Sequence, residues 1–428
     1  MLYHLINWLK ELGVKIPGNA LFQFITSRVL LAVIFSLVIS AVFGKKFINY
    51  LRKKQVGETV RDLGLAGEQQ KKGTPTMGGF IIITAILVPT LLLADLSKAY
   101  IRLMLFATLW LGLIGFIDDY LKLRAKKLAQ QQGIAYKKGD KDGLAGWFKI
   151  LGQVVLGFVV AMTLLFNNNT KAWREFTGDN LPADTSTVKI HRVPIDNRER
   201  VFVEANEPIT TIPFVKTHEF NYSKLLPAGL RSLTWVLYVI VVIFIVTAVS
   251  NGANITDGID GLATGTSAII GACLGIFAYA SGNIRFAEYL NIMYIPNLGE
   301  LSIFIGALIG ACVGFLWYNA YPAQVFMGDT GSLTLGGIIA ALAIIVRKEL
   351  LIPIFCGVFL VEVLSVSLQV SYFKYTKRKY GEGKRIFLMS PLHHHYQKLG
   401  YHESKIVTRF WIVTILCIVF AIVTLKVR

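Results

Sequence analysis

Residues 233–249 read LTWVLYVIVVIFIVTAV, an uninterrupted apolar stretch. A helix that crosses a bilayer needs about 20 mostly apolar residues, so this stretch predicts a membrane span. Similar runs recur along the chain, and 54% of its 428 residues are hydrophobic. A soluble secreted or cytosolic protein is therefore excluded, and so is a disordered one, because charged residues are few and lie between apolar runs.

Ten such runs are present, and lipid leaves backbone groups no partner outside a helix. The sequence therefore predicts an all-α integral membrane protein of about ten transmembrane helices, formed as one polytopic domain over residues 1–428. An even number of helices places both termini on the same side of the membrane. The runs lie at residues 20–43, 77–94, 101–117, 150–166, 229–250, 262–281, 301–320, 333–346, 350–373 and 408–427.

The net charge of +18 is concentrated in three connections, at residues 45–72, 122–149 and 374–405, each with eight lysines or arginines. With ten helices, all three connections fall on one side, which the positive-inside rule makes cytoplasmic. Both termini are then extracytoplasmic. In a chain this apolar, the basic loops indicate anionic membrane lipids as partners, and we expect no nucleic acid.

Two further segments lie outside this pattern. The first residues, MLYHLINWLKELG, predict an amphipathic helix at the outer interface. Residues 167–231 predict an extracytoplasmic insertion with a small β-hairpin around Asp196-Asn197, because apolar and polar residues alternate on both sides. We expect this insertion to be peripheral, so that a short linker could replace residues 170–226.

Acidic residues follow or precede several runs. Asp118 and Asp119 end one run, and neighbours on a helix point about 100° apart, which predicts different roles for them. Asp257 and Asp260 share a helix face in NITDGIDG, and Asp329 precedes another run. Each alone could be a helix cap or a solvated span end. Together they place five acids at the basic face, an arrangement suited to phosphate groups and Mg²⁺.

Two other segments suggest phosphate or sugar contacts. KKGTPTMGG, starting at Lys71, combines lysine with hydroxyl groups and glycine, although a basic helix start explains it equally well. PLHHHY contains His393, His394 and His395. Consecutive histidines cannot all reach one zinc ion from a helix, so donation to phosphate or sugar oxygens is the favoured interpretation.

In this order, KKGTPTMGG, GFIDDYLK, NITDGIDGLA, YPAQVFMGD and PLHHHYQKLGYHE resemble the motifs of the phospho-N-acetylmuramoyl-pentapeptide-transferase family. That family belongs to the superfamily of polyprenyl-phosphate sugar-1-phosphate transferases. The resemblance implies an Mg²⁺-dependent enzyme of the bacterial inner membrane with its active site at the cytoplasmic face. It would convert UDP-N-acetylmuramoyl-pentapeptide and undecaprenyl phosphate to lipid I and UMP, in peptidoglycan synthesis. A homodimer is a candidate assembly.

The resemblance also assigns site residues. Asp329 would bind Mg²⁺, with Asp118 and Asn254 as further candidate ligands. Asp118, beside Asp119, would act as base or orient the lipid phosphate. The remaining assignments are a ribose and diphosphate region at Asn254 and Asp257, uracil contacts from Lys71, Asp260 and Phe326, and a polar wall of Thr76, Lys122, Lys149, Asn319, Gln369, His393, His394 and His395. Direct attack by the lipid phosphate is favoured, and a covalent aspartyl intermediate is the alternative.

Two other functions fit parts of the sequence. A related transferase could use a UDP-N-acetylhexosamine without peptide. An ion-coupled transporter could use the acids as a translocation path, although it would need them at mid-membrane depth rather than at span ends. A membrane scaffold would explain the hydropathy but leave the clustered acids without a role.

The predicted topology can be tested by cysteine labelling. A cysteine replacing Lys137 should react only with a reagent supplied from the cytoplasm, and one replacing Thr187 only with a reagent supplied from outside. Labelling of both from the same side would contradict the arrangement of ten spans.

Overall fold

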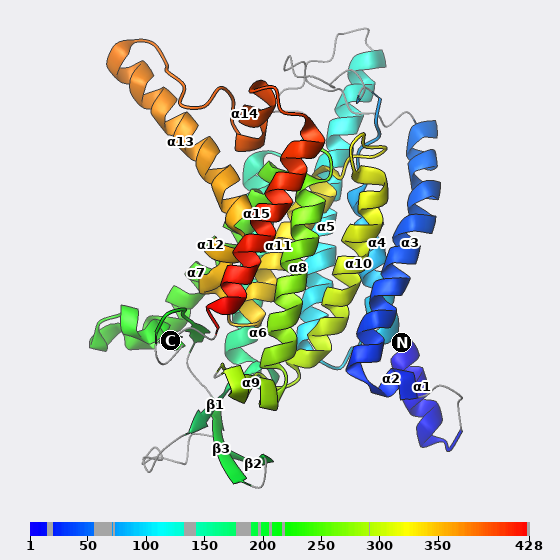
Figure 1. Ribbon diagram of the computed structural model, residues 1–428, viewed down its shortest axis with the longest axis vertical. Coiled ribbons are helices and arrows are strands. Elements are labelled where there is room, and N and C mark those ends of the chain that lie inside the picture. The colour runs from blue at the N-terminus through cyan, green and yellow to red at the C-terminus, as the bar shows by residue number, and fades with distance from the viewer. Residues whose placement is uncertain are drawn as a thin grey trace.

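The computed structural model describes residues 1–14, 20–54, 71, 73–131, 143–176, 190–195, 198–204, 208–215, 219–290 and 292–425. It shows a helical bundle with a small β region at one end (Figure 1). The helices are α1 (Leu2–Glu11), α2 (Ala20–Gln23), α3 (Ile25–Lys53), α4 (Gly79–Leu93), α5 (Ala99–Gln131), α6 (Gly146–Phe166), α7 (Thr234–Thr256), α8 (Leu262–Ser281), α9 (Ile284–Leu290), α10 (Leu301–Asn319), α11 (Gly328–Ile345), α12 (Ile352–Phe355), α13 (Gly357–Tyr380), α14 (Leu392–Lys398) and α15 (Glu403–Val423).

Each predicted apolar run is helical, which confirms the all-α membrane fold. Among the described residues, nine helices are long and apolar enough to cross a membrane. The remaining run forms α4, which has 15 residues and spans roughly 22 Å at 1.5 Å per residue. That length is shorter than a bilayer core, but α4 packs against α3, α10 and α11, so protein surrounds much of it.

Helix α11 lies at the centre of the bundle. In the most apolar 18-residue stretch of α11, 89% of the residues are buried, compared with 28% in the corresponding stretches of α13 and α15. Glycine lets neighbouring helices come close to it: a Cβ on Gly79 of α4 would lie 2.1 Å from the Gly331 amide nitrogen, and one on Gly115 of α5 would lie 2.4 Å from the Asp329 carbonyl oxygen. The absence of side chains there allows close backbone approach. The contact at Gly115 brings the acidic end of α5 to the start of α11.

The two ends of the bundle differ. Helix α14 and the last turns of α13 lie at one end, where α13 leans away from its neighbours, whereas α1, α9, the strands and the end of α15 lie at the other (Figure 1). The chain ends therefore share one end of the bundle, as an even number of spans requires. Which end faces the cytoplasm stays a prediction. Some basic residues of the predicted inner loops, and both labelling positions, lie outside the described residues: Arg61, Lys72, Lys137, Lys138, Lys141 and Thr187.

The predicted amphipathic N-terminal helix is α1. Ile6 is buried, whereas Leu5 and Trp8 are exposed, and α1 packs against α4. The guanidinium carbon of Arg28 lies 4.3 Å from the ring centre of Tyr3, so the helix is also fixed to α3.

The predicted hairpin is confirmed by antiparallel pairing of β2 (Ile190–Ile195) with β3 (Arg198–Glu204), although Asp196 and Asn197 lie outside the described residues. Three further strands were not predicted, because each has three or four residues and offers little alternation to recognise. Strand β1 (Trp173–Phe176) joins β3, and β4 (Ile209–Thr211) pairs with β5 (Glu219–Asn221).

The expectation of a wholly peripheral insertion is wrong for its second half. Tyr222 is 2% exposed, and its hydroxyl donates to Glu349 Oε1 at 3.1 Å. Lys348 Nζ, fully buried, donates to Thr211 Oγ1 at 2.6 Å, and the Thr211 amide donates to the Arg347 carbonyl. Burial lowers the pKa of Lys348 to about 8, although Glu349 opposes that shift. Strand β4 and Tyr222 therefore satisfy charged groups buried after α11.

This packing predicts a cost for removing one hydroxyl. Tyr222→Phe deprives the buried Glu349 carboxyl of a donor and should lower the free energy of unfolding by about 1–3 kcal/mol. Thermal unfolding of the purified protein in detergent would measure it. Tyr279→Phe makes the same change on a partly exposed ring of α8 and should have little effect. Equal stability of the two variants would show that the contact between Tyr222 and Glu349 does not stabilise the fold, and that the whole insertion is peripheral.

Candidate active site

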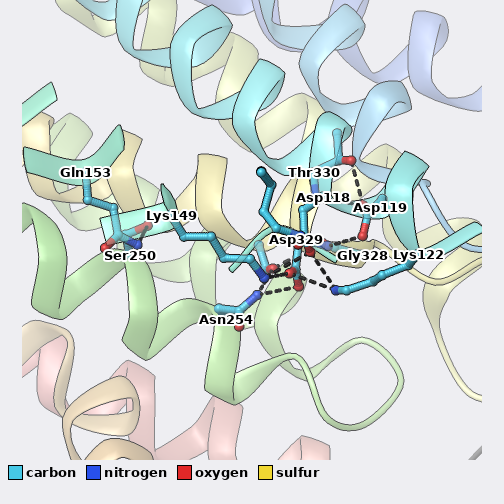
Figure 2. Close-up of polar contacts among 12 residues, drawn as sticks. Asp118, Asp119, Lys122, Lys149, Gln153, Ser250, Asn254, Gly328, Asp329 and Thr330 are labelled. Atoms are coloured by element: carbon cyan, nitrogen blue, oxygen red, sulfur yellow. Dashed lines mark hydrogen bonds and ion pairs between the residues drawn. The ribbon is translucent and has the colours of Figure 1, made fainter. Parts of the chain in front are cut away.

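Three carboxylates meet where α5 ends its apolar stretch and α11 begins (Figure 2). Asp118, Asp119 and Asp329 each offer an oxygen, and these oxygens lie within 4.8 Å of one another. Asp118 and Asp119 are buried, and Asp329 lies in the first turn of α11. Residues separated by more than 200 positions are joined here because α5 and α11 cross at Gly115.

Two lysines bridge two of these acids. Lys122 Nζ lies 2.6 Å from Asp118 Oδ2 and 3.0 Å from Asp329 Oδ2. Lys149 Nζ, from the start of α6, lies 2.9 Å and 2.5 Å from the same two oxygens. Figure 2 shows the two ammonium groups approaching the carboxylates from two sides. The attraction between the ammonium and carboxylate groups offsets part of the cost of removing them from water.

Asp119 has different hydrogen-bond partners from Asp118, since neighbouring side chains on a helix point in different directions. Its Oδ1 accepts from the Asp329 amide at 3.2 Å, and its Oδ2 accepts from the Thr330 amide and hydroxyl at 2.9 and 2.6 Å. These amides belong to the first turn of α11, which lacks intrahelical acceptors. Asp119 therefore caps α11 from another helix and fixes the direction of Asp329.

Asn254, near the end of α7, holds the other side of Asp329. Its Nδ2 donates to Asp329 Oδ1 and to Ser332 Oγ, both at 2.8 Å. One turn earlier, Ser250 accepts from Gln153 and donates to the Leu333 carbonyl. Figure 2 shows the contact between Gln153 and Ser250 to the left of the carboxylates, and the hydrogen bonds of Ser250 tie α6, α7 and α11 together.

The donor chemistry fits a divalent metal ion. Carboxylate oxygens are the ligands that hard cations prefer, and three carboxylates exceed the charge of the two lysines. Asp329 and Asp118 would supply the ligands, and Asn254 would keep the Asp329 carboxylate in place. Asp119 is less free to do so because its oxygens already accept three hydrogen bonds.

Lys71 and Asp260 form a second polar group. Lys71 Nζ lies 2.8 Å from Asp260 Oδ1 and 2.5 Å from Glu403 Oε1. Burial alone would lower the pKa of Lys71, but the ion pairs with Glu403 and Asp260 outweigh it, and the pKa is raised. The ammonium group is therefore charged at neutral pH.

The three histidines face different partners. His393 is fully buried, its Nδ1 lies 3.1 Å from Glu362 Oε2, and its ring packs on Gly258, where a Cβ would meet Nε2. His394 Nδ1 contacts Gln397, and burial is the main reason why its pKa falls to about 4. His395 Nδ1 accepts from the Leu388 amide. Each of the three rings therefore has a different partner within the protein.

The other predicted residues are distributed around these groups. Thr76 is buried beside Gly328, close to Asp119, and Asp257 is partly exposed at the end of α7. Phe326 is partly buried, and its backbone pairs with Pro75 and Gly78.

Two predicted wall residues bind backbone instead of facing the acids. Asn319 accepts from the Gly261 amide and the Thr264 hydroxyl and donates to the Val325 carbonyl. Gln369 accepts from the Ile386 and Phe387 amides. The side-chain amides of Asn319 and Gln369 therefore fix the loops that carry other site residues.

Comparison with known proteins identifies the family. The sequence model of glycosyl transferase family 4 matches residues 191–347. The chain is 56% identical to the phospho-N-acetylmuramoyl-pentapeptide-transferase of Flavobacterium psychrophilum, 55% to that of Flavobacterium johnsoniae and 53% to that of Parabacteroides distasonis. Each alignment covers 100% of both chains. The chain belongs to the phospho-N-acetylmuramoyl-pentapeptide-transferase family. It is therefore an enzyme and a multi-pass bacterial membrane protein, which sets aside the transporter and scaffold interpretations.

In this member of the phospho-N-acetylmuramoyl-pentapeptide-transferase family, two acids contact predicted site residues that the sequence did not connect to them. Glu403 accepts from Lys71, and Glu362 contacts His393. A signal existed for Glu362, because an acid inside an apolar run is costly unless it has a partner. Glu403 ends the last family motif, but it resembles an ordinary helix start.

Proposed function

We propose that the protein transfers phospho-N-acetylmuramoyl-pentapeptide from its UDP conjugate to undecaprenyl phosphate, giving lipid I and UMP, with Mg²⁺, in peptidoglycan synthesis. The observation that carries the proposal is the pair of lysines held between Asp118 and Asp329 at one end of the bundle. The names of the relatives support the choice of donor.

Phosphoryl transfer between two anions depends on charge neutralisation and alignment more than on covalent help from the protein. The three acids and two lysines leave the cluster one formal negative charge in excess, which favours a divalent cation. Asp329 and Asp118 would hold Mg²⁺ there, and the bound ion would neutralise phosphate charge. Lys122 and Lys149 would then turn from the carboxylates to phosphate oxygens.

Asp118 and Asp329, the two carboxylates beside the lysines, would have different roles in the reaction. Asp329 would be the principal ligand of the metal, and Asp118 would orient the acceptor phosphate or take up its proton. Direct attack by the lipid phosphate is the route that we favour, and a covalent aspartyl intermediate is the alternative. Lys71, Asp260 and Phe326 would bind the uracil.

We also propose that this end of the bundle faces the cytoplasm, with both termini extracytoplasmic. The nucleotide donor is soluble and highly anionic, so the basic connections would attract it to this face. The acceptor phosphate is confined to the membrane interface, where the ends of the spans lie.

A single assay tests the proposed function. Purified protein should release UMP from UDP-N-acetylmuramoyl-pentapeptide when Mg²⁺ and undecaprenyl phosphate are both present, and much less from a UDP-N-acetylhexosamine without peptide. Asp329→Asn keeps the size and removes the charge, so turnover should vanish in folded protein. Asp118→Asn should lower kcat more than it changes donor KM.

The contrary results are equally specific. Preference for the smaller donor would assign the chain to the related transferase reaction. Release of one equivalent of UMP without acceptor would indicate the covalent route. Near-normal turnover of Asp329→Asn would show that Asp329 does not bind the metal and serves only the first turn of α11.

The proposed uracil contact can be tested separately. Phe326→Ala should weaken donor binding by about 1–3 kcal/mol, the range for a base stacked on an aromatic ring. UMP inhibition constants for the two proteins would measure the change. Equal constants would show that the ring serves the packing of the loop and does not touch the base.

A further inference from the structure

The carboxylate of Glu403 joins its own helix, α15, to three other parts of the chain. Its Oε1 accepts from Lys71 Nζ at 2.5 Å and from the Asp260 amide at 2.7 Å. Its Oε2 accepts from Gln397 Nε2 at 3.4 Å, and Gln397 in turn contacts His394. The residue is 5% exposed although it opens α15 at the end of the bundle.

A helix-start acid usually has a simpler role. Glutamate in a first turn interacts favourably with the helix dipole and remains solvated. Glu403 instead accepts hydrogen bonds from other segments, and the partners of its Oε1 are residues that we assign to the uracil pocket. A buried carboxylate is costly unless paired, so this placement requires the contact with Lys71.

Lys71 requires such a partner as well. Its side chain has a long, flexible stem and comes from the connection before α4, outside the regular helices. Asp260 Oδ1 fixes the ammonium group from one side, while Asp260 Oδ2 accepts from the Ala323 amide. Without Glu403, a single carboxylate would hold Lys71, and the Asp260 amide would lose its acceptor.

We propose that Glu403 is a positioning residue for nucleotide recognition, which holds Lys71 and the Asp260 turn in the arrangement that binds the uracil. This inference rests on the proposed function, because that function assigns the donor and its base to Lys71 and Asp260. Glu403 would influence affinity for the nucleotide and leave the transfer step, at the Asp118 and Asp329 carboxylates, largely unaffected.

The test compares Glu403→Gln with the intact chain in the UMP-release assay. Donor KM and the UMP inhibition constant should both rise roughly 10-fold to 100-fold, the range for a lost hydrogen bond to a charged group. The kcat should stay within about three-fold, since the altered interaction acts on binding. The KM for undecaprenyl phosphate should not change. Glu382→Gln makes the same chemical change at an exposed position and should leave all constants unaltered.

A double variant separates positioning from a general structural effect. If Glu403 acts partly through Lys71, then Lys71→Gln combined with Glu403→Gln should weaken UMP binding by clearly less than the product of the two single losses, and any remaining loss would come through the Asp260 amide. Independent, multiplying losses would overturn the proposal. So would an unchanged donor KM, or a loss confined to kcat.

If Glu403→Gln does not fold, Glu403→Asp carries the test: the shorter acid cannot reach both donors, so a several-fold weaker UMP affinity is expected, and an unchanged one overturns the proposal. If the intact chain releases no UMP from UDP-N-acetylmuramoyl-pentapeptide, the proposed function itself has failed. If it does release UMP and Glu403→Gln binds normally, only the role of Glu403 has failed.

Discussion

The site depends on mutual compensation of charge between Lys122, Lys149, Asp118 and Asp329. None of these groups could remain ionised alone at the edge of an apolar bundle without a large desolvation cost. The contact at Gly115 is what makes compensation possible, because it brings α5 close enough for Asp119 to cap α11. Capping, ion pairing and helix crossing therefore support one another, and a change in any of them would displace Asp329.

The same compensation leaves the site ready for its ligands. A lysine that pairs with a carboxylate in the free protein can exchange that partner for a phosphate at a modest electrostatic cost, since both partners are anions. A cation bound by the released carboxylates would complete the exchange. The arrangement thus holds charges of both signs near the place where we propose that the anionic substrates meet, and these charges do not have to come from the solvent.

The sequence predicted the parts of the fold that local pattern controls. Each apolar run became a helix, because hydropathy over about 20 residues decides whether a segment enters the bilayer. The acids at span ends were recognisable for a similar reason, because a carboxylate such as Asp118 or Asp329 beside an apolar span is costly unless it has a partner. Lys71 and Glu403, in contrast, are separated by 332 positions, and nothing in local spacing indicates that they pair. Asn319 and Gln369 were predicted as part of a polar wall, but their contacts with backbone groups depend on loop geometry that no periodicity encodes. Strand β4 was missed because its three residues are specified by the buried charges after α11.

The position of the charged groups also separates this enzyme from a transporter on physical grounds. A translocation path needs polar groups through the depth of the membrane, whereas the clusters around Asp329 and Lys71 both lie where spans end. The buried charges after α11 are at the opposite end, and Thr211 and Tyr222 of the insertion cover them. Between the two ends, α11 presents buried, largely apolar residues. A helix of that kind isolates its ends from each other, so a soluble nucleotide and a membrane-bound acceptor can react at one face without opening a path to the other.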